Sequence, residues 1–240
     1  MSSYNHRLWR RNEPLLQTDF LVRERITGWL GPIVGKTILD AGCGEGYVVR
    51  KLAGLGAKVE AFDISPEMIA MAESREHHKI RYRIGDISNV LDIYPANSFD
   101  IVVLCGVIGS FNESDMYTNI GKIAGVIKNG GVLLVATNHM ESYIKKAKSK
   151  WVEFTTEPEA TKETQCVGLK FRNHECEDLF NGKYFFYSEN QVKKALIKGG
   201  INPIRVEAPL ATESDLNHFP HMWGDEKSVP YHLVVIGQKE

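Results

Sequence analysis

The sequence has no long hydrophobic run, few cysteines and no excess of charge of either sign. Its longest apolar runs, such as residues 101–104 and 132–136, have the length of a strand and fall far short of the ~20 residues that cross a bilayer. The 29 basic and 30 acidic residues give a net charge of -1, whereas proteins that bind nucleic acid or membrane surfaces usually carry a basic excess. We therefore expect neither a nucleic-acid partner nor a membrane.

Cysteine usage and the first residues indicate a cellular compartment. The four cysteines show no C-x-x-C spacing, which favours free thiols in a reducing cytoplasm over a disulfide framework. The first eleven residues contain no apolar stretch of the kind that a secretory signal requires. Both observations predict a cytoplasmic protein.

The sequence does contain a regular alternation of apolar and helical blocks. Hydrophobic residues make up 43% and charged residues 25% of the 240 positions, as in a soluble globular domain. The predicted strands are 36–40, 59–63, 80–84, 99–104, 132–136, 204–207 and 231–237, and the predicted helices are 46–56, 113–128, 188–199 and one that begins at Ser65-Pro66. Strands that alternate with helices predict a single α/β domain whose mostly parallel sheet is covered on both faces.

The alternation stops between residues 140 and 187. The lysines of this stretch are interpreted as a solvated helix face: Lys145, Lys146, Lys148 and Lys150. Thr/Glu-rich and aromatic segments follow, without a regular pattern. We interpret residues 140–187 as an irregular cap inserted into the domain 1–240.

The segment Ile38-Leu39-Asp40-Ala41-Gly42-Cys43-Gly44-Glu45-Gly46 carries the strongest functional signal. An acid at a strand end is followed by G-x-G-x-G and the start of a helix, so a ligand can lie against bare main chain. A dinucleotide-binding loop would read G-x-G-x-x-G and place a pyrophosphate on the helix N-terminus. Here the third glycine comes one residue early, and the acid favours a positively charged ligand. A dinucleotide-dependent oxidoreductase is the alternative.

This segment and four further motifs resemble those of the class I S-adenosylmethionine-dependent methyltransferases. The further motifs are Asp63 at the end of the second strand, Gly85-Asp86-Ile87 after the third, Phe99 to Gly106 on the fourth, and Gly130 to Val135 on the fifth. Residues 229–235 also look like the last strand of that family. The resemblance covers about residues 36–137 and 188–240. It implies a Rossmann-like, doubly wound, mostly parallel seven-stranded sheet with a cap inserted after strand five.

The resemblance also implies a division of the chain and a cofactor. Residues 36–139 would form the cofactor-binding core and 188–240 the C-terminal part of the sheet. Residues 140–187 would form the acceptor-side cap, and 1–35 an N-terminal lid or arm in which Tyr4 and Trp9 face the cofactor. The cofactor would be S-adenosyl-L-methionine, the product S-adenosyl-L-homocysteine, and no metal would be needed.

The resemblance implies ten cofactor-binding residues near the ends of the first four strands: Asp40, Gly42, Gly44, Gly46, Asp63, Ile64, Met68, Asp86, Ile87 and Cys105. Among the acids, Asp40 would act on the methionine ammonium, Asp63 on the ribose hydroxyls and Asp86 on the adenine amine. The glycines would admit the methionyl part, the apolar residues would pack against the adenine, and Cys105 would border the sulfonium.

The absence of certain motifs narrows the range of possible methyl acceptors. The chain reads Leu104-Cys105-Gly106-Val107 after strand four, where enzymes that methylate DNA amino groups or protein glutamine carry N/D-P-P-Y and metal-dependent catechol enzymes carry an acid. A Lys-Asp-Lys-Glu tetrad of the ribose-methylating type is not evident. We predict transfer to a nitrogen or oxygen atom of a small metabolite, by a monomer or a homodimer. A tRNA-base or protein methyltransferase and a non-catalytic, cofactor-binding partner subunit are the alternatives.

His139, immediately beyond strand five, is the predicted general base, because an oxygen acceptor with a high pKa or a protonated amine needs one. A loop histidine bonded to the backbone is the alternative reading, and His174, His218 and His221 are other candidates. The aromatic run 184–187 either lines an acceptor pocket or packs inside the cap. Since function in such folds lies on loops beyond the carboxyl ends of strands, the cap and the N-terminal arm are predicted to select the acceptor.

Overall fold

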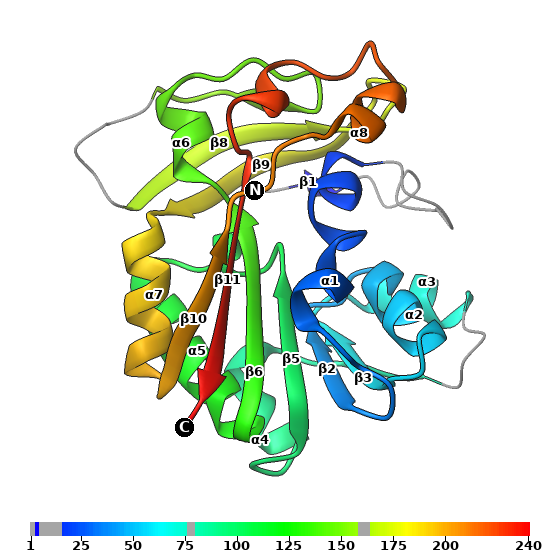
Figure 1. Ribbon diagram of the computed structural model, residues 1–240, viewed down its shortest axis with the longest axis vertical. Helices are drawn as coiled ribbons and strands as arrows, with labels where there is room; N and C mark the ends of the chain where they lie inside the picture. Colours follow the sequence, from blue (N-terminus) through cyan, green and yellow to red (C-terminus); the bar gives the residue numbers. More distant parts are fainter. Residues whose placement is uncertain (1–2, 5–15, 76–79, 158–163) are drawn as a thin grey trace.

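A computed structural model describes residues 3–4, 16–75, 80–157 and 164–240 of the chain. In this part of the chain, a large sheet carries helices on both faces and a second, smaller sheet lies across one of its ends (Figure 1). Trp9 of the predicted arm lies outside the described residues. Among the helices that are described, none has the length and apolar character needed to span a bilayer.

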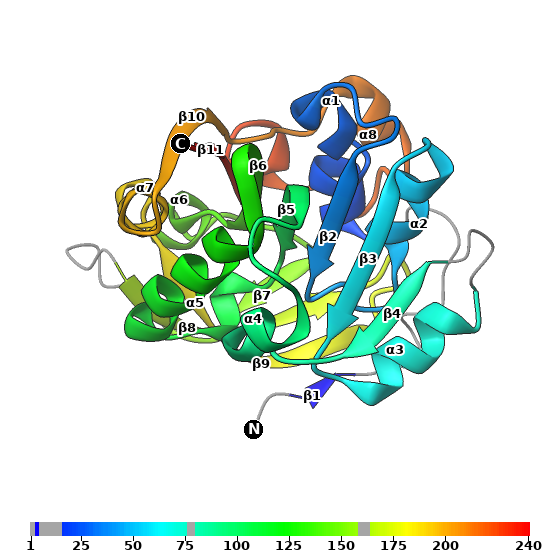
Figure 2. The same cartoon turned by 90° about the horizontal axis from the view of Figure 1, so that it is seen from below.

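The large sheet has the predicted seven strands: β2 (Thr37–Ala41), β3 (Lys58–Asp63), β4 (Arg81–Ile84), β5 (Phe99–Cys105), β6 (Ile127–Asn138), β10 (Ile201–Glu207) and β11 (His232–Lys239). Their order is β10-β11-β6-β5-β2-β3-β4, with β10 and β4 at the two edges (Figure 2). The neighbours from β6 to β4 are parallel, whereas β11 is antiparallel to β6 and β10. The predicted fold class is confirmed.

Local sequence signals explain where the main helices begin. The helices are α1 (Ile26–Leu30), α2 (Tyr47–Gly54), α3 (Pro66–Glu73), α4 (Val90–Ile93), α5 (Glu113–Val126) and α7 (Glu189–Lys198), with the short turns η2 (Asp19–Arg23), η3 (Ile87–Asn89) and η4 (Ile108–Ser110). Ser65 caps α3 ahead of a proline at its first position, and Ser188 with Gln191 forms a capping box on α7. Both caps satisfy N–H groups that a helix leaves unpaired.

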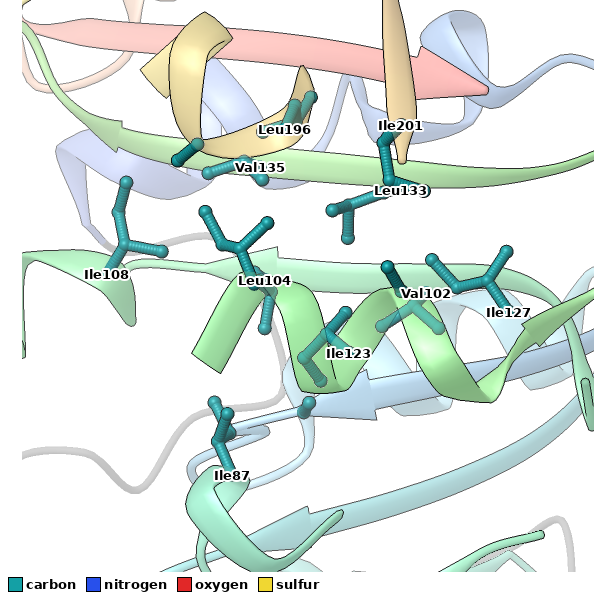
Figure 3. Close-up of a cluster of buried hydrophobic side chains, with 14 of the residues drawn as sticks. Ile87, Val102, Leu104, Ile108, Ile123, Ile127, Leu133, Val135, Leu196 and Ile201 are labelled. Atoms are coloured by element: carbon teal, nitrogen blue, oxygen red, sulfur yellow. The ribbon is translucent and has the colours of Figure 1, made fainter. Parts of the chain in front are cut away.

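Two hydrophobic clusters hold the helices to the two faces of the large sheet. Alternate residues of β6 point to opposite faces, so Leu133 and Val135 join one cluster while Leu134 and Ala136 join the other. The first cluster packs α5 and α7 on the sheet, with Ile123 and Leu196 among its contacts (Figure 3). The second packs η2, α1 and α2. Each fully buried Leu, Ile or Val stabilises the fold by about 1.5–3 kcal/mol.

The cap is a regular sheet, which the sequence pattern did not predict. After α6 (Met140–Ile144), its antiparallel strands are β7 (Val152–Phe154), β8 (Thr164–Arg172) and β9 (Asp178–Tyr187), and β1 (Ser3–Tyr4) pairs with β9. Residues 140–187 therefore form an insertion after β6, as expected, but a regular sheet replaces the irregular segment that the pattern indicated. In β8 the apolar–polar alternation is clear only from Val167 to Phe171, because the buried Gln165 is polar and the neighbouring Cys166 is exposed.

The lysines of the cap and the segment before β11 also differ from expectation. The helix α6 ends before the lysines, so Lys148 and Lys150 are exposed in a loop rather than on a helix face. This loop packs against the segment between β10 and β11, which contains α8 (Glu213–Asn217) and η5 (Asp225–Lys227). Lys148 and Asp225 exchange two hydrogen bonds of 2.7 and 2.8 Å. The cap is thus built from two separate stretches of chain.

Candidate active site

A cavity of about 460 Å³ lies between the carboxyl ends of the parallel strands and the cap. Its lining comes from the loop after β2, from the residues that follow β3, β4 and β5, and from the end of β6. The π-helix η2 and the cap strands complete it. Its volume is in the range of small-molecule sites.

The glycine loop after β2 forms one wall of the cavity. Gly42 has φ +83°, and a Cβ there would lie 2.5 Å from a methyl of Val107. Gly44 has φ +55°, and nothing lies within 4 Å of the position that its Cβ would take. Both glycines line the cavity, whereas Gly46 does not; a Cβ on Gly46 would meet the Tyr82 hydroxyl at 2.7 Å. The loop thus leaves bare backbone facing open space, as the sequence predicts for a ligand cradle.

Asp40 is a buried acid without a partner for one of its oxygens. The side chain is only 2% exposed, its Oδ1 has no hydrogen bond, and it lines the cavity. Burial raises the pKa of Asp40 to about 7, although the positive charge of Arg23 opposes the shift. A buried, unsatisfied carboxyl beside a cavity suits a cationic ligand.

Asp63 and Asp86 stand at the ends of the next two strands and also line the cavity. Asp63 accepts hydrogen bonds from the backbone N–H of Gly44 at 2.8 Å and of Ser65 at 2.9 Å, so it holds the glycine loop in place. Asp86 caps η3 by accepting from the N–H of Ser88 at 2.8 Å. Each carboxylate keeps lone pairs for a further donor.

The apolar residues predicted for the cofactor gather around the same wall. Met68 and Ile87 are buried and Ile64 is exposed, and all three line the cavity together with Cys105 at the end of β5. The structure therefore brings nine of the ten predicted residues to one cavity, and Gly46 is the exception. Their individual roles stay predictions.

The sequence did not single out Arg23, which enters this wall from η2. Its Nη1 donates to Asp19 at 3.1 Å, while its Nε is buried without a partner, and the residue lines the cavity. Arg23 and Asp40 thus place opposite charges on one cavity. The sequence pointed to Arg23 only indirectly, through the lid expected for residues 1–35.

The predicted base, His139, is not part of the cavity lining. Its Nδ1 accepts the backbone N–H of Glu141 at 3.0 Å, so the ring caps α6. Burial lowers the pKa of His139. His174 stacks on Phe219, His218 bonds the Ser214 carbonyl and His221 is exposed, and none of these three lines the cavity either.

The structure instead brings His232, at the start of β11, to the cavity. The ring is buried and its Nε2 has no hydrogen-bond partner. The sequence contained a signal for it: a histidine at the entrance of an otherwise apolar strand. Without the pairing of β11 with β6, nothing indicated which way it faces.

The half of the cavity beneath the cap is aromatic. Five hydrophobic cap residues line it together with Arg172: Trp151, Phe171, Leu179, Phe180 and Tyr184. Within the run 184–187, Tyr184 lines the cavity, whereas Phe186 and Tyr187 are buried in hydrophobic clusters. Tyr184 therefore faces the cavity, Phe186 packs inside the cap, and Tyr187 packs in the cluster of the large sheet. The indole N–H of Trp151 is buried without a partner.

Comparison with known proteins agrees with this arrangement. Residues 38–131 match the family model described as a methyltransferase domain. The chain is 29% identical over 164 residues to a ubiquinone biosynthesis O-methyltransferase of Rhodopseudomonas palustris (strain BisB5), covering 61% of this chain and 63% of that protein. It is 36% identical over 124 residues to a malonyl-[acyl-carrier protein] O-methyltransferase of Serratia marcescens, covering 51% and 45%. The chain thus spans less than two thirds of the length of these curated relatives.

A solved structure shares the fold over most of the chain. The S-adenosylmethionine-dependent methyltransferase from Mesorhizobium loti superimposes with a TM-score of 0.67 at 19% identity, over 90% of this chain and 96% of that one. The seven-stranded sheet and the glycine-loop cradle define a Rossmann-like fold. Through the domain match over residues 38–131 and through this fold, the chain is similar to the class I S-adenosylmethionine-dependent methyltransferases.

Proposed function

We propose that this chain transfers a methyl group from S-adenosyl-L-methionine to a nitrogen or oxygen atom of a small metabolite. One observation carries the proposal: the glycine loop and the buried, unpartnered carboxyl of Asp40 open into the same cavity as the aromatic wall of the cap. The first half suits a cationic cofactor, and the second suits an apolar acceptor.

The residues of the cradle fit this cofactor. Asp40 and Arg23 supply the opposite charges that the ammonium and carboxylate of its methionyl end require, and the bare backbone at Gly44 leaves room for it. Asp63 offers acceptors to the ribose hydroxyls, and Met68 and Ile87 pack against the adenine. When bound, the cofactor supplies an electrophilic methyl group on a sulfonium. Methyl transfer then depends mainly on how the chain orients the acceptor and excludes water.

The cap supports an uncharged, aromatic or apolar acceptor. Arg172, a cation in the cap-side lining, forms ion pairs with Glu153 and Asp178, so its charge is already balanced. Recognition of a nucleic acid usually depends on several cations free to contact phosphates. Among the described residues, no group of three or more His, Cys, Asp or Glu could hold a metal ion. The aromatic lining and the balanced charge of Arg172 favour a small aromatic acceptor over a tRNA.

Calorimetry tests the cofactor half of the proposal. S-adenosyl-L-homocysteine should bind with a Kd in the micromolar range, and NADH should show no heat of binding. Binding of NADH without binding of S-adenosyl-L-homocysteine would support a dinucleotide-dependent oxidoreductase instead.

Label transfer tests the acceptor half. The chain is incubated with methyl-labelled S-adenosyl-L-methionine and a panel of phenols and amines, and label should enter at least one of them. Label in added tRNA or protein would support those acceptors instead. Transfer that begins only when a partner protein is added would support the non-catalytic subunit.

A further inference from the structure

His232 occupies a position that the family motifs do not explain. It opens β11, pairs with Asn138 at the end of β6, and lies on the same face of the sheet as Ala136 and Cys105. Because β11 runs antiparallel to β6, its first residue stands at the edge where the cavity and the cap meet. The side chain is 4% exposed and lines the cavity.

One nitrogen of the ring is free to take part in chemistry. Nε2 of His232 is buried without a hydrogen-bond partner, and the residue lines the cavity. A neutral imidazole carries its proton on one nitrogen and a lone pair on the other. A proton on Nδ1 and a lone pair on Nε2 would be the arrangement of a histidine that accepts a proton from a substrate.

The surroundings keep this ring neutral. Burial, together with the charges of Arg23 from η2 and His139 from the start of α6, lowers the pKa of His232 to about 3. Methyl transfer removes the positive charge of the sulfonium. A proton that arrives on Nε2 in the same step therefore moves a positive charge within the cavity and adds none, which offsets the cost of a buried imidazolium.

We propose that His232 is the general base that binds and deprotonates the nucleophilic O–H or N–H of the methyl acceptor. The acceptor atom forms a bond to the methyl carbon, the carbon–sulfur bond breaks with its electron pair left on sulfur, and the proton of the acceptor passes to Nε2. Opening of the cavity then returns this proton to water. The inference rests on the proposed function and assigns its proton acceptor.

Nitrogen NMR of the imidazole tests the inference without any turnover. In ¹⁵N-histidine-labelled protein, the His232 signals are assigned by their loss in His232→Gln. We expect Nδ1 protonated, Nε2 unprotonated and no titration between about pH 5 and 8. A ring protonated on Nε2, or one that titrates in this range, would overturn the inference. This measurement tests the protonation state of His232 even if none of the probe acceptors is methylated.

Phenols of graded acidity test the step itself. His232→Gln should slow transfer to unsubstituted phenol by ~100-fold or more, and should spare a nitrophenol that is already ionised at the assay pH. A merely structural defect would slow both reactions equally. His221→Ala, an exposed histidine outside the cavity, is the matched control.

Two outcomes separate the failure of the inference from that of the proposed function. If His139→Ala, and not His232→Gln, produces the acidity-dependent loss, the base is His139 and the inference is wrong while the function stands. If wild-type protein fails to bind S-adenosyl-L-homocysteine, the proposed function itself fails.

Discussion

At the scale of single residues, the cavity gathers polar atoms that the fold buries without a partner. Asp40 Oδ1, Arg23 Nε and His232 Nε2 are buried and unsatisfied, and their residues line one cavity. An unsatisfied buried polar group costs about 1–3 kcal/mol. Groups that cost stability and face a cavity are expected at sites kept for binding or catalysis rather than for folding.

Asp40→Asn should stabilise the fold at high pH and weaken cofactor binding. Because burial raises the pKa of Asp40 from 3.8 to about 7, the stability this carboxyl gives is full below pH ~4 and is lost as the pH rises through about 7. Above this pH the ionised carboxyl lowers the free energy of unfolding by about 4 kcal/mol, because each pH unit between the two pKa values contributes about 1.36 kcal/mol. We expect the variant to raise the Tm at pH 8, to change it little at pH 4, and to weaken S-adenosyl-L-homocysteine binding. An unchanged Tm at pH 8 would contradict this assignment.

Asp63→Ala should weaken cofactor binding for two reasons. It removes the acceptor predicted for the ribose, and it releases the N–H of Gly44 that tethers the glycine loop. Calorimetry should show a loss of about 2–3 kcal/mol in the binding of S-adenosyl-L-homocysteine, roughly 30- to 150-fold in Kd. The fold should persist because Asp63 is half-buried. Asp92→Ala, an exposed acid on α4 outside the cavity, should leave the Kd unchanged.

At the scale of elements, the sequence predicts the large sheet, the cofactor wall and the position of the cap, but not the sheet that the cap contains. Buried parallel strands are nearly continuous apolar runs, as in residues 132–136 of β6. Such runs can be recognised in the sequence without any knowledge of the tertiary structure. The residues predicted to bind the cofactor follow these strands directly, so a correct prediction of the strands also locates these residues. Trp151 and His232 reach the cavity from positions 81 residues apart in the sequence. Only tertiary packing brings them together, and no local pattern marks it.

Gly109→Ala should disturb the cap while sparing the cofactor wall. A Cβ on Gly109 in η4 would lie 2.5 Å from Cδ1 of Tyr184, so Tyr184 must move from its place in the cavity lining. We expect acceptor turnover to fall on the order of tenfold to 100-fold, with S-adenosyl-L-homocysteine affinity nearly unchanged. Gly121→Ala is the control, since nothing lies within 4 Å of its Cβ position in α5. It should leave turnover intact and add about 0.5–1 kcal/mol of stability. Equal effects of both variants would contradict the contact.

At the scale of the whole molecule, three distant segments close the cavity as one unit. The buried Glu226 accepts hydrogen bonds from Gln17 at 2.8 Å, from the hydroxyl of Ser149 in the cap loop, and from the N–H of Gly224 at 2.5 Å. Gln17 itself lines the cavity. The N-terminal segment and the cap, which are predicted to select the acceptor together, are therefore joined through a carboxyl whose importance no motif signalled.

Glu226→Ala should loosen this closure without unfolding the large sheet. Three donors would lose their acceptor inside the protein, which costs about 2–4 kcal/mol in the free energy of unfolding. Hydrogen exchange should show lost protection over residues 16–23 and 145–151, while β5 and β6 stay protected, because local opening follows the segments that share the lost contacts. The same opening should speed the release of S-adenosyl-L-homocysteine in stopped-flow experiments. Glu213→Ala, an exposed acid on α8, should do neither. Exchange that rises equally in β5 and β6 would mean that Glu226 stabilises the whole fold, and that the N-terminal segment and the cap do not close the cavity through it.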